Sequence, residues 1–321
     1  MRLARAGALI PAMATAGPDA PGTPAVDAAG DVLSPALRSL LATLRLRPRH
    51  ALGRQGIGHH PSRNRGSGLE FAQYRPYESG DEPRQIDWKL YARSDRFFVR
   101  EAERDSPVRA WVLLDTTASM TQADEAVPAR TRFDVARLLV TCVYEIAQRQ
   151  GDACGLVLCG GAGVSLVTPG TGPRQRDRLR HALAAVRPQG EWPDAKALAP
   201  AWGRIARGDL LIAIGDWFDD AAVEQLVQLA NAGRDVIALQ VLTADERDFP
   251  FRDGRRFVEP EAGESLLGDG PALRADYLAR FEAARRALAA RFAAAGIRFA
   301  THVIDTPPDA LLGALFGDRA P

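Results

Sequence analysis

Residues 111–120 read WVLLDTTASM, an apolar run that ends abruptly in a carboxylate and hydroxyls. The apolar residues before Asp115 suit a strand that is buried on both faces. Asp115, Thr117 and Ser119 then place an oxygen-bearing side chain at every second position. Such a pattern is typical of a strand-to-helix turn, a nucleophile or a site for a hard metal ion.

A second apolar run ends in the same way, since residues 209–216 read DLLIAIGD and close on Asp216. Apolar strands and amphipathic helices alternate along this part of the chain. Strands are expected at 153–160, 163–169, 234–242 and 297–304, and helices at 131–146, 174–186, 195–206, 219–232 and 273–295. This alternation predicts a doubly wound α/β fold, with a mostly parallel sheet and helices on both faces.

Helix-end signals support these boundaries. Thr131 and Asp134 form a capping-box pattern, and Asp219 is placed to cap the helix that follows it. Gly233 and Gly296 stand where helices end in a left-handed residue. Upstream, extended stretches at 96–103 and 108–114 are separated by a turn-forming segment and predict a β-hairpin that leads into the strand ending at Asp115.

Composition indicates a globular chain whose charge steers it to no class of partner. The 321 residues are 46% hydrophobic and carry a formal charge of +1. No stretch approaches the ~18 apolar residues of a membrane span. Three cysteines without a CxxC spacing read as reduced core residues, which suits a cytoplasmic protein.

We expect three segments along the chain: a disordered leader over 1–35, a basic extension over 36–107 and the α/β domain over 108–317. Residues 32–69 contain no acidic residue and are rich in basic ones. The basic residues of this stretch are Arg38, Arg45, Arg47, Arg49, Arg54, Arg63, Arg65, His50, His59 and His60. We favour a solvated arm over a nucleic-acid-binding segment, because aromatic residues do not alternate with the basic ones.

The position of the two carboxylates favours a ligand site. In an open α/β sheet, ligands bind beyond the carboxyl ends of the strands, where Asp115 and Asp216 are expected. Oxygens from both strand ends suit Mg²⁺, which takes six oxygen ligands and retains several waters. Catalysis by a serine or threonine has less support, since His181 and His302 lack a suggestive partner and no GxSxG or GxxxxGK[ST] motif occurs. A turn with a helix cap remains the alternative.

Two stretches resemble a known family. The residues DTTAS at 115–119 resemble the DxSxS element of von Willebrand factor A domains, whose alternating oxygens form a metal-ion-dependent adhesion site. The stretch FAQYRPYESGDEPRQIDWKLYAR, residues 71–93, resembles the signature of the bacterial family called domain of unknown function 58, whose core is similar to that fold. The likeness covers about residues 68–305.

The resemblance implies a Mg²⁺ or Mn²⁺ site. Asp115, Thr117 and Ser119 match its first loop, and Asp216 matches the carboxylate after the fourth core strand. Pro193, in GEWPDAKAL, stands where the family's second-loop threonine would be. Either Asp194 substitutes for that threonine or the site is degenerate.

The signature segment itself mixes charged side chains with a tryptophan. The residues concerned are Arg75, Asp81, Arg84, Asp87, Trp88 and Arg93. We predict that they form either an Arg and Asp network that clamps the extension onto the core or a partner-binding surface.

The resemblance also implies binding rather than turnover. At an adhesion site, an acidic side chain of the partner fills the open position of the metal. Proteins of this kind are paired with a MoxR-type AAA+ ATPase, which implies an adaptor or assembly factor that acts on a client protein. The alternatives are a Mg²⁺-dependent hydrolase of phosphoryl substrates and a scaffold with a degenerate site.

Overall fold

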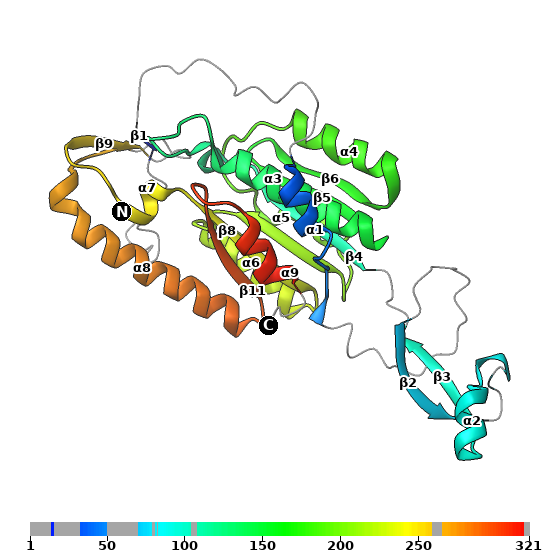
Figure 1. The fold of residues 1–321 in the computed structure, drawn as a ribbon. Helices are drawn as coiled ribbons and strands as arrows, with labels where there is room; N and C mark the ends of the chain where they lie inside the picture. Colours follow the sequence, from blue (N-terminus) through cyan, green and yellow to red (C-terminus); the bar gives the residue numbers. More distant parts are fainter. Residues whose placement is uncertain are drawn as a thin grey trace. The chain divides into compact units, whose positions relative to one another are not determined.

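The computed structural model describes residues 14–15, 33–49, 70–78, 81, 83–103, 108–258 and 265–317. The chain divides into a larger unit, residues 1–51 with 108–321, and a smaller unit, residues 52–107. Both are drawn in Figure 1.

A central sheet organises the larger unit. Within the described residues it has six strands, in the order β11-β8-β7-β4-β5-β6. Their bounds are β4 Arg109–Asp115, β5 Ala153–Gly160, β6 Gly163–Gly170, β7 Leu210–Gly215, β8 Asp235–Leu242 and β11 Arg298–Val303. All neighbouring strands run parallel except β6, which pairs antiparallel with β5. This is the order of a doubly wound sheet, read from the β6 edge, with an antiparallel edge strand.

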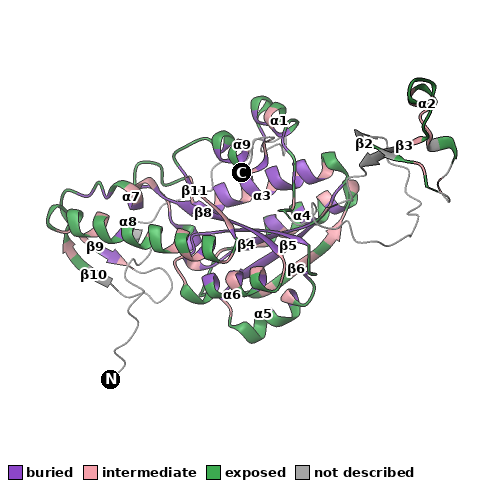
Figure 2. Ribbon diagram, turned by 90° about the horizontal axis from the view of Figure 1, so that it is seen from below, coloured by how far each residue is buried: buried purple, intermediate pink, exposed green. Residues whose placement is uncertain are grey.

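Helices cover both faces of the sheet. In Figure 2 the strands are mostly buried, and the helices on either side of them are exposed on their outer sides. Ala110, Val112 and Leu114 of β4 join a core cluster with helices α1, α3, α4 and α9, whereas Trp111 and Leu113 join a second cluster with α5, α6 and α8. The bounds are α1 Pro35–Leu41, α3 Arg132–Gln150, α4 Gly172–Ala185, α5 Ala195–Trp202, α6 Asp220–Asn231, α8 Gly270–Ala294 and α9 Asp309–Phe316. The predicted fold class is confirmed, because alternate residues of each strand face opposite helical layers.

The predicted helix ends are also confirmed. Thr131 and Asp134 form a reciprocal capping box at α3, and Asp219 accepts hydrogen bonds from two backbone amides at the start of α6. Gly233 and Gly296 adopt positive φ angles of 86° and 71° just beyond α6 and α8.

A small antiparallel sheet lies beside the central one. Its strands are β1 (Ala14–Thr15), β9 (Gly254–Val258) and β10 (Ser265–Asp269), and the short helix α7 (Ala244–Asp248) precedes it. Phe249, Phe251 and Phe257 form its aromatic core.

The predicted boundary at residue 36 differs from the structure. Leu37 and Leu41 of α1, with Leu44 and Leu46 after it, are buried in the first core cluster. With Leu33, five buried leucines pack residues 33–49 against the larger unit, so residues 36–49 of the predicted extension belong to the α/β core. Of the predicted leader, residues 14–15 pair with β9, and most of the rest lies outside the described residues. Outside them too are Arg54, Arg63, Arg65, His50, His59 and His60.

The predicted hairpin between 96–103 and 108–114 is wrong. Strand β3 (Phe98–Glu103) pairs antiparallel with β2 (Glu70–Pro76) in the smaller unit. The 3₁₀ turn η2 (Pro83–Gln85) and helix α2 (Trp88–Ser94) lie between these two strands in the sequence. Strand β4 is hydrogen-bonded to β5 on one side and to β7 on the other. Both edges of β4 are therefore occupied, and no edge is left for β3.

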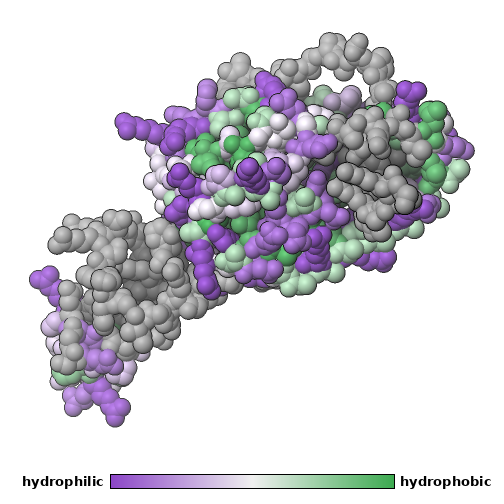
Figure 3. Space-filling model, turned by 180° about the vertical axis from the view of Figure 1, so that it is seen from behind, coloured by the Kyte–Doolittle hydropathy of each residue, from purple (hydrophilic) through white to green (hydrophobic). Residues whose placement is uncertain are grey.

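The remaining expectations concern cysteines and membranes. Cys142, Cys154 and Cys159 are free and buried, as predicted, and burial raises the pKa of Cys142 and Cys154 to about 12. Across the described residues, no helix has both the length and the apolar character needed to cross a bilayer. On the face drawn in Figure 3, hydrophilic and apolar side chains are interspersed over the larger unit.

Candidate functional site: the ends of strands β4 and β7

The two carboxylates predicted at strand ends belong to neighbouring central strands. Asp115 is the last residue of β4, and Asp216 follows Gly215, the last residue of β7. After β4 the chain continues to β5 on one side of it, and it later returns to β7 on the other side. The two carboxyl ends therefore border the topological switch point, where open α/β sheets bind their ligands.

The first loop brings three oxygen-bearing side chains into contact. Asp115 Oδ1 accepts hydrogen bonds from the Thr117 amide at 2.9 Å and from Thr117 Oγ1 at 2.8 Å. Thr117 Oγ1 lies 2.9 Å from Ser119 Oγ. All three residues are buried. The alternating residues therefore converge as the sequence predicted, at the start of the 3₁₀ turn η3 (Ala118–Thr121).

Glycines allow the neighbouring backbones to approach this loop. The backbone amide of Gln189 donates to Thr116 O, and the backbone amide of Ala118 donates to Gly190 O. A Cβ on Gly160 would lie 2.3 Å from Thr116 O, and one on Gly190 would lie 2.6 Å from Gly161 Cα. The segment that precedes α5 thus borders the first loop through backbone contacts.

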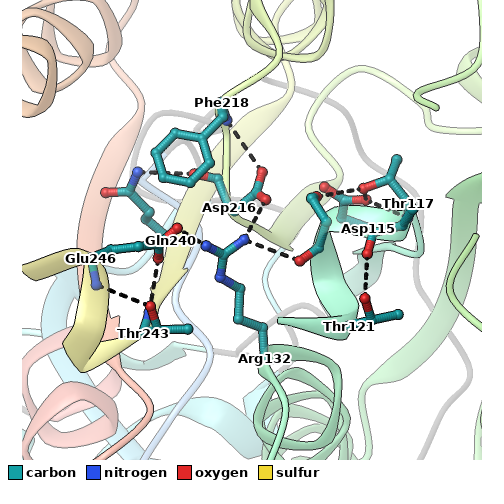
Figure 4. Close-up of polar contacts among 11 residues, drawn as sticks. Asp115, Thr117, Thr121, Arg132, Asp216, Phe218, Gln240, Thr243 and Glu246 are labelled. Atoms are coloured by element: carbon teal, nitrogen blue, oxygen red, sulfur yellow. Dashed lines mark hydrogen bonds and ion pairs between the residues drawn. The ribbon is translucent and has the colours of Figure 1, made fainter. Parts of the chain in front are cut away.

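Arg132 joins the two strand ends. It is the first residue of α3 and has an exposed fraction of 0%. Its Nη1 donates to Ser119 O at 3.1 Å and to Asp216 Oδ2 at 2.8 Å, and its Nη2 donates to Glu246 Oε1 (Figure 4). One nitrogen atom contacts both loops, so the loops after β4 and β7 meet within the span of a single guanidinium group.

Two further hydrogen bonds hold Asp216 in place. Its Oδ1 accepts from the Phe218 amide at 3.2 Å, and its backbone oxygen accepts from Gln240 Nε2 at 2.9 Å. The next residue, Trp217, has a positive φ of 57°, which is uncommon for a bulky residue. Its indole donates to Leu239 O at 2.9 Å and thereby holds this turn against β8.

The third contact of Arg132 comes from helix α7. Glu246 lies in the first turn of that helix and forms a capping box with Thr243, whose amide donates to Glu246 Oε2 at 3.0 Å. The phenyl ring of Phe218 lies 5.4 Å from the guanidinium carbon. Arg132 therefore ties together the η3 loop, the end of β7 and α7.

The electrostatics of the site centre on this buried cation. Burial lowers the pKa of Arg132, while the charges of Asp216 and Asp115 act in the opposite direction. An arginine keeps its proton in proteins, so the guanidinium stays charged beside the carboxylates. Burial, with a smaller contribution from the charge of Asp115, raises the pKa of the Cys159 thiol and so favours its protonated form.

The predicted metal ligands fit a divalent cation only in part. Asp115, Thr117 and Ser119 are assembled and offer the oxygens that Mg²⁺ prefers. Asp216 is engaged in an ion pair with Arg132. Asp194 is exposed and caps α5, accepting from the Ala197 amide at 2.7 Å. Among the described residues, no group of three or more His, Cys, Asp or Glu side chains is placed to hold a metal.

The predicted signature residues lie in the smaller unit. Asp87 caps α2 through the amides of Lys89 and Leu90 and accepts from Tyr74 Oη at 3.0 Å. Trp88 is 59% exposed and packs edge-on against Tyr91 and Phe97.

The other signature residues are placed as follows. Asp81 accepts from the Glu78 amide, and Arg75 lies in β2 opposite Val99. Arg84 and Arg93 are exposed. Within this unit the signature thus supplies a helix cap and an aromatic cluster.

Sequence reasoning missed Arg132 and Glu246. A signal for Arg132 was present, because it lies three, four and seven residues before Val135, Ala136 and Leu139 and so shares their buried stripe. An arginine in that position must have a charged or polar partner. Glu246 is the fourth residue of the capping-box pattern at 243–246, but that pattern alone does not reveal a second partner.

The fold defines the class of this protein as a doubly wound α/β domain, with oxygen-bearing side chains gathered where β4 and β7 end. The family described as "Protein of unknown function DUF58" matches residues 73–287, and the chain belongs to this family. The resemblance inferred from residues 71–93 is thereby confirmed.

Similar proteins include the uncharacterized proteins Rv1480 of Mycobacterium tuberculosis and Mb1516 of Mycobacterium bovis. Each is 27% identical over 269 residues, which is 82% of this chain and 83% of the relative. Among solved structures, BatB, a conserved hypothetical protein from Bacteroides thetaiotaomicron, gives a TM-score of 0.40 at 16% identity and covers 65% of this chain and 95% of its own. The SpRpn10 VWA domain gives a TM-score of 0.36 at 11% identity, covering 64% and 94%.

Proposed function

We propose that this chain is a protein-binding module whose binding surface is the strand-end site between β4 and β7. The observation that carries the proposal is the meeting of the two loops at the switch point, where Arg132 Nη1 contacts both Ser119 O and Asp216 Oδ2. A site held together from three elements is suited to bind a partner in a defined orientation.

The proposed cofactor is Mg²⁺ or Mn²⁺. Asp115, Thr117 and Ser119 would hold the ion, with water as further ligands. A hard cation bound there supplies an open coordination position for a carboxylate. The acidic group would come from the partner protein, and the three residues of this chain would orient the ion towards it.

The proposed partner is a MoxR-type AAA+ ATPase, with this chain as an adaptor or assembly factor for a client protein. Support comes from membership of the family and from the likeness of residues 71–93 to its signature. An acidic side chain on the ATPase or on the client would complete the metal's coordination.

The metal is tested by calorimetric titration of the full chain with Mn²⁺. Asp115→Asn should weaken binding by more than about tenfold, because it removes the charged ligand from the set Asp115, Thr117 and Ser119. Asp220→Asn is the matched control, since Asp220 is exposed and pairs with Arg291 on the surface. Equal affinity in the wild type and in Asp115→Asn would refute the cation site.

The partner is tested by biolayer interferometry against a purified MoxR-type ATPase from the same organism. Binding should require Mg²⁺ and should be lost in Asp115→Asn but not in Asp220→Asn. If the ATPase fails to bind the wild type in Mg²⁺, the proposed partner is wrong.

A second candidate, a protein-binding scaffold that needs no metal, is favoured by the ion pair between Asp216 and Arg132. In that case the ATPase would bind equally in Mg²⁺ and in chelator. The same binding experiment therefore separates the two forms of the module.

A further inference from the structure

The charge of Arg132 is the feature of the site that the metal hypothesis does not use. Its side chain is 0% exposed, and the two carboxylates that pair with it, those of Asp216 and Glu246, are also buried. Removing a guanidinium from water is costly, and packed apolar side chains often stabilise a core as well as a buried ion pair does. A buried charge at a ligand site therefore calls for a role connected with that site.

The position of the guanidinium indicates that role. Asp216 is the carboxylate that a strand-end metal would recruit from β7, and its Oδ2 is held by Arg132 Nη1 at 2.8 Å. The same nitrogen contacts Ser119 O, the backbone oxygen of a residue in the Asp115, Thr117 and Ser119 cradle. The positive charge thus stands between the cradle and the second carboxylate.

An arginine is suited to this position in a way that a lysine is not. Nη1 and Nη2 donate in different directions, so one side chain reaches Asp216, Glu246 and Ser119 O at once. The contact with Glu246 anchors the guanidinium from the side of α7.

We infer that Arg132 is the resident cation of the strand-end site, which keeps Asp216 out of the coordination shell of any divalent ion. The inference rests on the proposed function for the location of the ion at Asp115, Thr117 and Ser119. It adds that the chain limits its own metal affinity, and that Asp216 serves as the counter-ion of Arg132 rather than as a metal ligand.

The experiment measures Mn²⁺ affinity by titration calorimetry in the wild-type full chain and in three variants of it. The double variant, which combines Arg132→Gln with Glu246→Gln, removes one positive and one negative charge together, so the formal charge of the cluster is unchanged. Because Asp216 is then released to the ion, this variant should bind Mn²⁺ at least about tenfold more tightly than the wild type. Adding Asp216→Asn to it should abolish the gain. Arg132→Lys, which keeps the charge, is the control and should show no gain.

Asp216→Asn in the wild-type background gives a test that does not depend on removing the arginine. The inference predicts Mn²⁺ affinity within about threefold of the wild type, because Asp216 is not a ligand there. A tenfold loss of affinity in Asp216→Asn would overturn it, as would a double variant that binds no more tightly than the wild type.

The thermal unfolding midpoint of the double variant shows whether it folds. The midpoint is measured without Mn²⁺ and with Mn²⁺ in molar excess, since an ion that binds the native state raises it. The midpoint should rise further with Mn²⁺ in the double variant than in the wild type, and an equal or smaller rise would overturn the inference. Tight binding by the double variant with none by the wild type would support the inference and refute the proposed cofactor. Binding by the wild type that Asp115→Asn abolishes, with no gain in the double variant, would do the reverse.

Discussion

At the scale of single residues, the candidate site depends on small side chains as much as on charged ones. Gly215 precedes Asp216, and a Cβ at that position would lie 2.8 Å from Asp115 Cβ and 2.9 Å from Asp115 Oδ2. The two neighbouring strand ends therefore bring Asp115 close to β7 only because residue 215 lacks a side chain.

Gly215→Ala tests this close approach. The added methyl group must displace Asp115 or the backbone, so we expect the free energy of unfolding to fall by about 1–3 kcal/mol, as in other overpacked cores. Chemical denaturation measures the change. Gly313→Ala in α9 is the matched control, because its Cβ would meet nothing within 4 Å. It should stabilise the helix by up to about 1 kcal/mol. Equal effects of the two substitutions would contradict the steric argument.

His302 predicts a pH dependence of stability. Its side chain is buried in β11, and desolvation, with the nearby charge of Arg130, lowers its pKa to about 4, while Asp305 acts in the opposite direction. In the unfolded chain the imidazole takes up a proton near pH 6.5. Between these two values the unfolded state binds more protons, so stability rises with pH across this window and is lost as the pH falls through it.

The expected size of this loss is about 3 kcal/mol between pH 7 and pH 4. It is measured as the difference in free energy of unfolding between the wild type and His302→Gln at each pH. His181→Gln, on the exposed side of α4, is the control. A difference between wild type and His302→Gln that does not change with pH would show that the imidazole is not held neutral by burial.

At the scale of elements, the sequence was most informative where a local interaction defines a boundary. The capping box of Thr131 and Asp134 and the cap of Asp219 involve residues within three positions of each other, so their pattern is visible in one dimension. The pairing of β3 was not visible, since extended residues do not state their partner. That partner, β2, lies more than twenty residues upstream, whereas β4 follows β3 directly.

The same reasoning applies to the site. Asp115, Thr117 and Ser119 are close in sequence, and their convergence was predictable from their spacing. The contacts of Arg132 with Asp216 and Glu246 span 84 and 114 residues. Only the buried position of an arginine on the apolar stripe of α3 hinted at them.

Thr131→Ala tests the contribution of the α3 cap. The substitution removes the side-chain acceptor for the Asp134 amide, and the hydroxyl's own hydrogen bond to Asp134 Oδ2. We expect a loss of about 1 kcal/mol in the free energy of unfolding, measured by chemical denaturation. Thr141→Ala, in the middle of the same helix, is the matched control and should cost less because alanine has the higher helix propensity. A larger loss at Thr141 than at Thr131 would contradict the assignment of the cap.

At the scale of the whole molecule, the division into units was only partly predictable. The change from polar segment to apolar strand near residue 108 marks one boundary, and the unit boundary falls there. The other boundary was hidden, because Leu37, Leu41, Leu44 and Leu46 are interspersed with arginines in a stretch whose charge suggested a solvated arm. Their burial shows that the α/β core is built from segments that precede residues 52–107 in the sequence as well as from segments that follow them.

This organisation predicts that residues 52–107 form an insertion that the core can lose. Replacing them with a linker of about 14 glycine and serine residues shortens the connecting loop about fourfold, which should change the free energy of unfolding by only about 1 kcal/mol. The variant should retain a single cooperative transition by circular dichroism. By contrast, Leu41→Ala in either background should cost about 2–5 kcal/mol, because the side chain is 1% exposed in the core. If excision of 52–107 abolished cooperative unfolding while Leu41→Ala had no effect, the core would depend on the smaller unit and not on α1, contrary to the packing of the leucines.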